Sequence, residues 1–392
     1  MHPISTNQKI LSIELLVLEP HIDGTSGSNR ASVANPPISA NTDIEAIKAW
    51  LAKYVDSAAT FNSYRKEAER LLLWCTYTLG KALSSLTHED LLLYKRFIQD
   101  PAPRALWVMT NQKVSRGNPN WRPFAGSLSS SSQRQAIVIL NSMFSWLVNA
   151  GYLAGNPLSL SRQRKQSQTA RITRYLDEDL WLEVKMTIEG LPRESFRERE
   201  HYSRSRWLFS LFYITGIRIS EVVNNSMGCF FQRKNKDGDI LWWLEITGKG
   251  KKIRLVPATS ELMAEVQRYR SQLGLSHEPI EGEVLPLVFP IGGQAKPMTR
   301  AGVHLVFKKV FQLTAERLAS QGDTGKADIE KLNRASAHWL RHTAGSRMAN
   351  AMDLRLVRDN LGHKSINTTN IYLHIEDDKR HEEMEKIHSL EW

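Results

Sequence analysis

Cysteine is scarce in this sequence, because Cys75 and Cys229 are the only two in 392 residues. Two cysteines cannot build a disulfide framework, and their apolar surroundings predict buried thiols in a reducing compartment. Long apolar runs are missing too: the segment from Ile10 to Leu18 carries Glu14 and is far shorter than a membrane span. These absences argue against a disulfide-rich secreted protein and predict a cytoplasmic protein that does not enter a membrane.

Acidic residues are missing from the stretch between Pro101 and Leu176. The cations in this stretch are Arg104, Lys113, Arg116, Arg122, Arg134, Arg162, Arg164, Lys165, Arg171 and Arg174. Together with a formal net charge of +11, they predict a positive surface that binds DNA phosphates, with an affinity that falls as salt rises. The alternative is a solvated basic loop and linker. Trp107, Trp121 and Phe124 could touch DNA or anchor the loop to its own core.

The first part of the chain is predicted to be helical. Residues 1–41 are rich in Ser, Asn, Gly and Pro, which indicates a flexible leader. A capping box formed by Thr42 and Glu45 opens an all-helical domain over residues 42–160. Its longest helix is expected from Ser129 to Ala150, before Gly151 and an Asn-Pro pair.

The second part is predicted to mix helices with a small sheet. A basic linker over residues 161–174 leads into a domain over residues 175–375. Three short runs with turn residues between them predict an antiparallel sheet, with strands at Cys229–Arg233, Ile240–Thr247 and Ile253–Pro257. Amphipathic helices follow, including one after Thr299 with Val303, Val306, Phe307, Val310 and Phe311 facing inward.

One short segment near the C-terminus holds the most telling chemistry. It contains His338, Arg341, His342, His363 and Tyr372. A phosphodiester is an anion that repels nucleophiles, so a protein that attacks one must surround it with cationic and hydrogen-bonding groups and aim a nucleophile at phosphorus. Tyr372 is the candidate nucleophile.

Four separated motifs, TGIRISEV, TGKGKKIRLVP, HWLRH and LGHKSINTTNIY, resemble those of the tyrosine recombinase, or phage integrase, family. The resemblance covers about Arg174 to His374 and, more loosely, the helical domain before it. It implies an α-helical core-binding domain followed by a mixed α+β catalytic domain with a small antiparallel sheet. It also implies an Xer-like site-specific recombinase that cleaves and rejoins DNA through a 3′-phosphotyrosyl intermediate and a Holliday junction, without metal, ATP or another cofactor.

The resemblance also implies a set of catalytic residues. These are Arg218, Lys249, His338, Arg341, His363 and Tyr372. The two arginines would contact non-bridging phosphate oxygens, for which a planar guanidinium fork is suited. The lysine would protonate the departing 5′-hydroxyl, and the two histidines would assist proton transfer from tyrosine and donate to a phosphate oxygen. His342 is interpreted as a structural histidine.

Some of these residues have alternative interpretations. Arg218 could instead cap its helix or pair with Glu221, and Lys251 or Lys252 could be the active amine in place of Lys249. Glu221 is interpreted as a buried hydrogen-bond partner that holds its helix, not as an acid catalyst.

The resemblance further implies partners. They are double-stranded DNA, three further copies of the chain in a homo-tetramer on two DNA sites, and accessory DNA-bending or directionality factors, with work at the nucleoid and on mobile elements. The tail over residues 376–392 is a charged helix with one apolar side, which could pack on its own domain or dock on a neighbouring subunit. Two rival functions are a monomeric type IB topoisomerase and a DNA-binding relic that does not cut.

Overall fold

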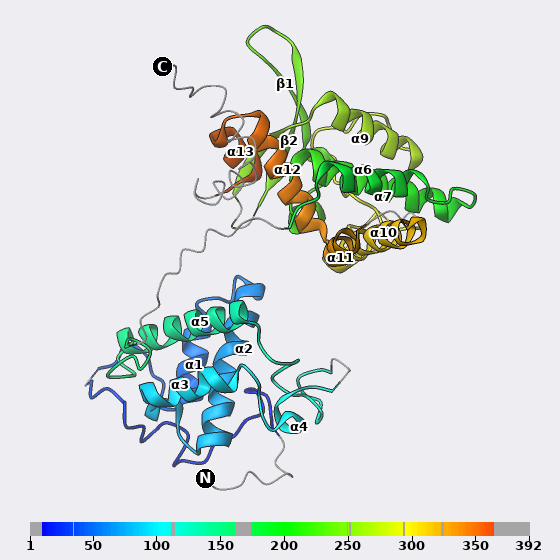
Figure 1. Ribbon diagram of the computed structural model, residues 1–392. Helices are drawn as coiled ribbons and strands as arrows, with labels where there is room; N and C mark the ends of the chain where they lie inside the picture. Colours follow the sequence, from blue (N-terminus) through cyan, green and yellow to red (C-terminus); the bar gives the residue numbers. More distant parts are fainter. Residues whose placement is uncertain are drawn as a thin grey trace, which may run out of the picture. The chain divides into compact units, whose positions relative to one another are not determined.

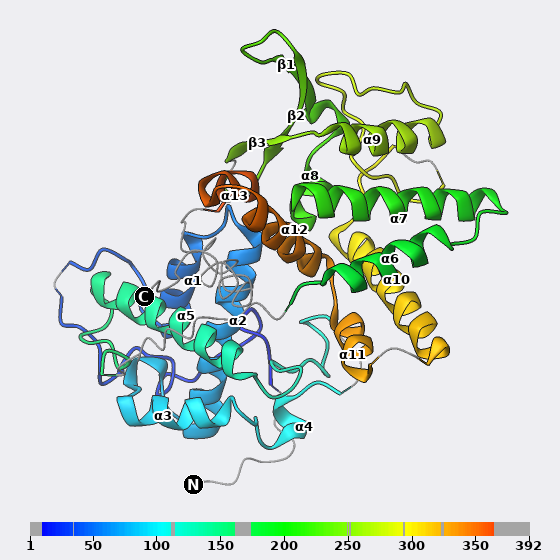
Figure 2. The ribbon, with the colours of Figure 1, turned by 45° about the horizontal axis from the view of Figure 1, so that its top comes forward.

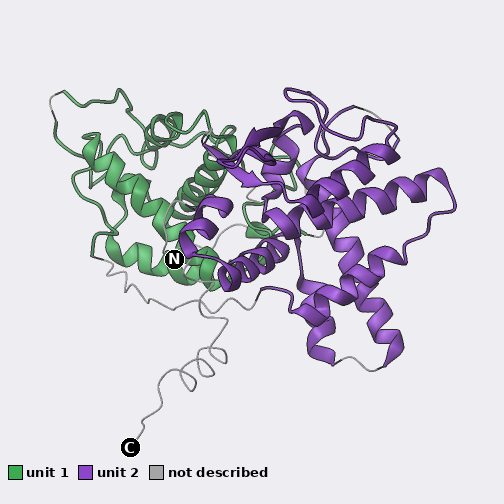
Figure 3. Ribbon diagram, turned by 90° about the horizontal axis from the view of Figure 1, so that it is seen from above, with its two compact units in different colours: residues 1–166 green, residues 167–392 purple. Residues whose placement is uncertain are grey.

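The computed structural model describes residues 10–33, 35–110, 114–160, 174–248, 250, 252–292, 295–322 and 325–363. The chain forms two compact units, residues 1–166 and residues 167–392, which Figure 3 shows in different colours. Each unit has its own apolar core. Among the helices of these described segments, none is long and apolar enough to cross a membrane.

The first unit is helical (Figure 1). Its α-helices are α1 (Asp43–Ala52), α2 (Ala58–Trp74), α3 (His88–Phe97), α4 (Arg104–Trp107) and α5 (Ser130–Asn149). The predicted capping box is present, since the Thr42 side chain accepts from the backbone N–H of Glu45. Thr87 and Asp90 form a second capping box that starts α3. Ser129 caps α5, so the longest helix lies where the sequence predicted it.

The aromatic residues of the basic stretch belong to the core of this unit. Trp107 and Phe124 are fully buried and Trp121 is nearly so. Phe97 packs edge-on against Trp107 with ring centroids 5.0 Å apart, and Arg70 donates through Nε to the carbonyl of Pro123 at 3.0 Å. The core-anchoring interpretation of these aromatic residues is therefore confirmed.

The predicted flexible leader is wrong for its described residues, 10–33 and 35–41. Ile10, Ile13 and Leu16 are buried in the core of the first unit, and the N–H of Ile13 donates to Oε1 of Glu69 at 2.8 Å. Further along, Arg30 forms an isolated β-bridge with Leu153. Apolar side chains spaced by three residues thus pack on the helices in spite of the polar composition around them.

The second unit mixes helices with one sheet (Figures 1 and 2). Its α-helices are α6 (Glu178–Glu189), α7 (Phe196–Thr215), α8 (Ile219–Asn224), α9 (Ser260–Gln272), α10 (Arg300–Gln321), α11 (Lys326–Arg334), α12 (Ala337–Ala351) and α13 (Leu354–Leu361). All five α10 residues predicted to face inward are buried. One of these residues, Phe307, packs on Phe209 and Phe212 of α7, with ring centroids 4.6 and 4.7 Å apart.

The sheet is antiparallel with the order β1-β2-β3. Its strands are β1 (Phe230–Lys234), β2 (Ile240–Thr247) and β3 (Ile253–Pro257). The last two have the predicted bounds, and β1 begins one residue later than predicted because Met227–Cys229 form a 3₁₀ turn. Cys229, predicted to be buried, is only partly so. Thr247 pairs with Ile253, so β2 and β3 form a hairpin whose connection begins at Gly248.

Candidate active site

A sharp turn between α7 and α8 presents Arg218. Gly216 ends α7 in the left-handed conformation with φ 61°, and Arg218 is the extended residue that starts α8. A Cβ on Gly216 would lie 2.5 Å from Cδ2 of Leu361 and 3.5 Å from Cβ of Ala344. Gly216 is therefore needed for two reasons. Its backbone is in the left-handed conformation, and α12 and α13 approach the end of α7 too closely for a side chain.

Glu221 fixes the direction of Arg218. Its two carboxylate oxygens accept from the backbone N–H and from Nη1 of Arg218, at 2.9 and 2.8 Å. The Glu221 side chain is 2% exposed, whereas that of Arg218 is 39% exposed. The interpretation of Glu221 as a buried hydrogen-bond partner is confirmed, and the pairing of Arg218 with Glu221, which was the alternative to its catalytic role, is present. The catalytic role of Arg218 stays a prediction. The exposed fraction of the Arg218 guanidinium can still meet an anion.

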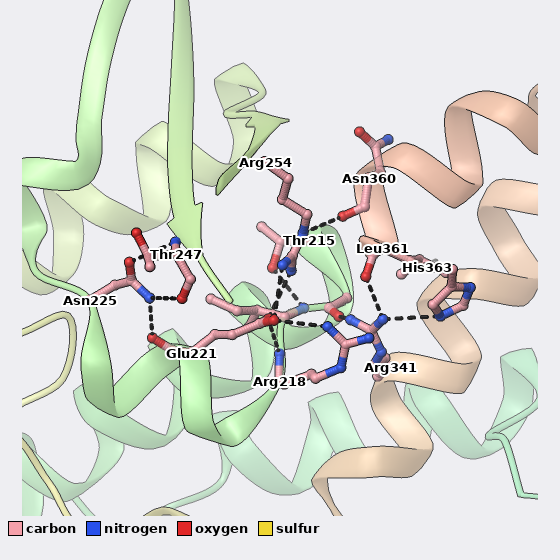
Figure 4. Close-up of polar contacts among 12 residues, drawn as sticks. Thr215, Arg218, Glu221, Asn225, Thr247, Arg254, Arg341, Asn360, Leu361 and His363 are labelled. Carbon is pink, nitrogen blue, oxygen red and sulfur yellow. Dashed lines mark hydrogen bonds and ion pairs between the residues drawn. The ribbon is translucent and has the colours of Figure 1, made fainter. Parts of the chain in front are cut away.

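A third residue, Arg254 on β3, completes this network and was missed by the sequence analysis (Figure 4). Its Nη1 and Nη2 donate to the two oxygens of Glu221 at 2.9 and 2.8 Å. Burial acts to raise the pKa of Glu221, but the hydrogen bonds and charges of Arg254 and Arg218 outweigh it and lower the pKa to about 2. The available signal was strand alternation, because Arg254 shares its strand face with the buried Val256.

Arg341 lies between the ends of two helices. It belongs to α12, is 2% exposed, and donates through Nη1 to the carbonyl of Gly216 and through Nη2 to that of Leu361 at 2.6 Å. Its Nη2 also lies 3.1 Å from Nε2 of His363. Because a guanidinium can only donate, Nε2 must be the acceptor, so His363 is neutral with its proton on Nδ1.

The histidines of the site are held neutral. Burial and the charges of Arg341 and Arg218 lower the pKa of His363 to about 4, and the same causes, with Arg174 added, lower the pKa of His338. Burial and the neighbouring His338 and Arg341 lower the pKa of His342 to about 4. The rings of His338 and His342 meet edge to face, with centroids 4.3 Å apart on α12. Each imidazole is therefore neutral near neutral pH, with one ring nitrogen that can donate a hydrogen bond and one that can accept.

The structure thus brings together four of the six predicted catalytic residues. Arg218, Arg341 and His363 lie in one network (Figure 4), and His338 is close enough for both arginine charges to lower its pKa. The other two, Lys249 and Tyr372, lie outside the described residues, as does the tail over residues 376–392. Lys252, the alternative amine that is described, is exposed on the β2–β3 turn.

The predicted DNA-binding cations of the first unit differ in their surroundings. Arg116 lies between two carboxylates, Glu69 and Glu14, the latter at 2.8 Å, and Arg104 pairs with Asp100 at 3.0 Å. These acids lie outside the acid-free stretch in sequence but beside it in space. The argument for an unpaired positive surface is therefore wrong for these two arginines.

The other described cations of that set also differ in their surroundings. Arg122 donates to the carbonyl of Ala105 on α4 at 3.1 Å and to the carbonyls of Pro119 and Trp121 in its own loop. Arg134 on α5 and Arg174 before α6 are exposed. Lys113, Arg162, Arg164, Lys165 and Arg171 lie outside the described residues.

The described side chains of the site are mainly arginines and histidines. Its one carboxylate, Glu221, forms ion pairs with Arg218 and Arg254. Over the part of the chain that the structure describes, no group of three or more His, Cys, Asp or Glu side chains could hold a metal ion. A cluster of guanidinium and neutral imidazole groups is suited to bind an oxyanion and to move protons around it.

The sequence is similar to those of known proteins. Residues 193–379 match the family model described as "Phage integrase family". The tyrosine recombinase XerD of Rhizobium meliloti (strain 1021) is 27% identical over 261 residues, which cover 66% of this chain and 75% of the relative. The tyrosine recombinase XerC of Neisseria meningitidis serogroup C is 28% identical over 324 residues, covering 82% and 87% of the two chains.

Solved structures show the same fold. The XerH site-specific recombinase, in a post-cleavage complex with its palindromic difH substrate, aligns with a TM-score of 0.57 at 18% identity. The alignment covers 87% of this chain and 83% of that one. The mixed fold class predicted from the sequence is confirmed by this similarity.

Proposed function

We propose that the chain, which is similar to the phage integrase family of tyrosine recombinases, cleaves DNA at the cluster formed by α8, α12 and α13. It is a site-specific recombinase, an enzyme that cuts and rejoins DNA. The observation that carries the assignment of the site is the convergence of Arg218, Arg341 and His363, which three separate elements bring into one network.

In this proposal Tyr372 attacks the scissile phosphorus. The new P–O bond to tyrosine forms as the bond between phosphorus and the 5′-oxygen breaks, so the DNA 3′ end becomes esterified to the protein. Arg218 and Arg341 hold the non-bridging oxygens, where charge builds up in the transition state. Lys249 protonates the 5′-oxygen as it leaves. Because the ester conserves the energy of the broken bond, attack by a 5′-hydroxyl rejoins the strand without ATP.

The neutral histidines serve proton transfer. A positively charged His363 could not accept from Arg341, so the observed contact requires the neutral imidazole. A neutral imidazole can take the proton of the Tyr372 hydroxyl or donate to a phosphate oxygen. We assign these two tasks to His338 and His363.

DNA recognition is proposed to involve both units. The helical core-binding domain over residues 42–160 and the catalytic domain over residues 175–375 would hold duplex DNA, with residues 161–174 as the link. XerH, a structural neighbour, was solved bound to its DNA substrate. Among the described cations of the predicted set, Arg104, Arg134 and Arg174 are exposed. Arg104 pairs with Asp100, so we assign the phosphate contacts to Arg134 and Arg174.

The proposed assembly is a tetramer on two DNA sites. Four copies would exchange strands through a Holliday junction, with the tail over residues 376–392 docked on the neighbouring subunit. Recombination would take place at the nucleoid in the cytoplasm, on a mobile element or a replicon. Accessory factors would set whether DNA is integrated or excised.

A nicked suicide duplex tests the proposed chemistry. The short fragment beyond the nick diffuses away after cleavage, so the covalent complex accumulates and migrates slowly on a denaturing gel. The native chain should form this adduct, and Tyr372→Phe should bind the duplex with nearly unchanged affinity and form none. Adducts that survive the substitution would place the nucleophile elsewhere. Relaxation of a plasmid that carries no specific site would favour a type IB topoisomerase instead.

A further inference from the structure

Arg254 is a largely buried arginine that the proposed reaction does not use. Its side chain is 10% exposed. Nη1 and Nη2 donate to Glu221 at 2.9 and 2.8 Å, and Nε donates to the carbonyl of Asn360 at 2.9 Å. Each of the three nitrogens of the guanidinium thus donates to a group within the protein.

Its first connection leads to Arg218. The carboxylate that Arg254 binds is the one that accepts from both the backbone and the side chain of Arg218. A carboxylate held at both oxygens by a planar fork can neither rotate nor shift along one bond. Arg254 on β3 therefore fixes, through Glu221, the direction of the Arg218 side chain at the start of α8.

Its second connection leads to His363. The Asn360 carbonyl that accepts from Nε belongs to the last turn of α13, and Gly362 follows with φ 63°. A Cβ on Gly362 would lie 2.9 Å from Cδ of Arg254. The chain that leads into His363 therefore lies against the Arg254 side chain, whose bond to Asn360 is drawn in Figure 4.

Its third connection leads to the β2–β3 turn. Gly248 is the first residue of that turn and its N–H donates to the carbonyl of Lys252 at 2.7 Å. A Cβ on Gly248 would lie 3.2 Å from Oε1 of Glu221 and 3.7 Å from Nη1 of Arg254. The base of the turn that contains Lys249 thus lies against the same ion pair.

We infer that Arg254 is a positioning residue for strand cleavage, because it joins α8, the β2–β3 turn and the end of α13 into one rigid junction. This inference rests on the proposed function of the site. The catalytic groups on these three elements must meet one phosphate, and a displacement of about 1 Å can cost about 100-fold in rate. Lysine keeps the charge of Arg254 but cannot bind both carboxylate oxygens and the Asn360 carbonyl in one plane.

The test compares Arg254→Lys with a matched control, Arg270→Lys. Arg270 lies on α9, is also buried, and binds Glu283 through Nη1 and Nη2 at 2.8 and 3.2 Å. Its Nε donates to the carbonyl of Ser276 at 2.7 Å. The two arginines therefore make the same kinds of bonds, but the residues that Arg270 binds, Glu283 and Ser276, belong to none of the catalytic elements.

Three quantities are measured for each full-length variant: the single-turnover rate of adduct formation on the nicked duplex, the affinity for an intact duplex, and the melting temperature. Arg254→Lys should slow adduct formation by about 10- to 100-fold and change the affinity by less than about twofold. Arg270→Lys should slow adduct formation by less than about threefold at an equal folded fraction. Equal rates for the two variants, or an affinity loss as large as the rate loss, would overturn the inference.

A substrate with sulfur in place of the bridging 5′-oxygen tests the connection to the turn. A thiolate leaves without being protonated, so this substrate does not need Lys249. The rate loss of Arg254→Lys should be smaller on the sulfur substrate than on the normal one. Losses of equal size would show that the turn does not depend on Arg254, and would overturn that part of the inference.

Gly248→Ala provides a second variant for the case that Arg254→Lys does not fold. It places a methyl group 3.2 Å from the Glu221 carboxylate and removes no charge, so it disturbs the same junction by crowding. It should also slow adduct formation with unchanged DNA affinity, and wild-type rates in this variant would count against the inference. A normal rate of adduct formation in either variant would count against the role of Arg254 only. The proposed function would be contradicted only if the native chain itself formed no adduct.

Discussion

Replacement of Glu221 by glutamine should make the stability of the second unit depend differently on pH. The Glu221 pKa falls from an ordinary value of 4.5 to about 2 in the folded protein. At about 1.4 kcal/mol for each pH unit, the ionised carboxylate contributes about 3 kcal/mol to folding at neutral pH. Because the folded-state pKa is the lower one, this contribution is complete above about pH 5 and is lost as the pH falls towards 2.

The assay is hydrogen exchange read on peptides from α7, α8 and β3, because it reports this unit alone. The difference in opening free energy between the native chain and Glu221→Gln should be about 3 kcal/mol at pH 7 and should shrink steadily below pH 4.5. Other carboxylates affect both proteins and cancel in the difference. A difference that stays constant from pH 7 to pH 3 would refute the reasoning, since it would show that the ionised form has no advantage in the fold.

Three further predictions concern other parts of the molecule. Gly216→Ala should destabilise the second unit by about 1–3 kcal/mol, because the new Cβ meets Leu361 at 2.5 Å; hydrogen exchange measures the loss, and native stability would contradict the close approach. The His363 imidazole should titrate near pH 4 in the free protein and at a higher pH when a phosphate binds; NMR titration would contradict this with a free-state midpoint near pH 6.5. Ile13→Ala should destabilise the first unit by about 2–5 kcal/mol, because Ile13 is buried; an unchanged melting curve would contradict the packing of the leader.

The elements that the sequence predicted well are those whose pattern is local. β2 and β3 have the predicted bounds because turn residues flank short apolar runs. The buried face of α10 follows from helical periodicity. The start of α7 has a weaker local pattern, because its first turns are charged and a capping box formed by Ser195 and Glu198 is the signal that marks it.

The features that the sequence did not reveal depend on contacts between distant residues. Arg254 meets Glu221 and Asn360, which local spacing does not relate to it. Likewise Arg116 meets Glu14, 102 positions away, so a stretch without acidic residues can still be neutralised. The motifs predicted which residues belong to the site, but not the ion pair that connects their elements.

The central claim is that the Tyr372 hydroxyl becomes esterified to the 3′ end of cleaved DNA. The most direct test traps the native chain on a nicked duplex, digests protein and DNA, and sequences the nucleotide-bearing peptide by tandem mass spectrometry. The account predicts a single modified peptide with a 3′-nucleotide attached at Tyr372 and a free 5′-hydroxyl on the released strand. A nucleotide on another residue, or a 5′-phosphate linkage, would contradict it.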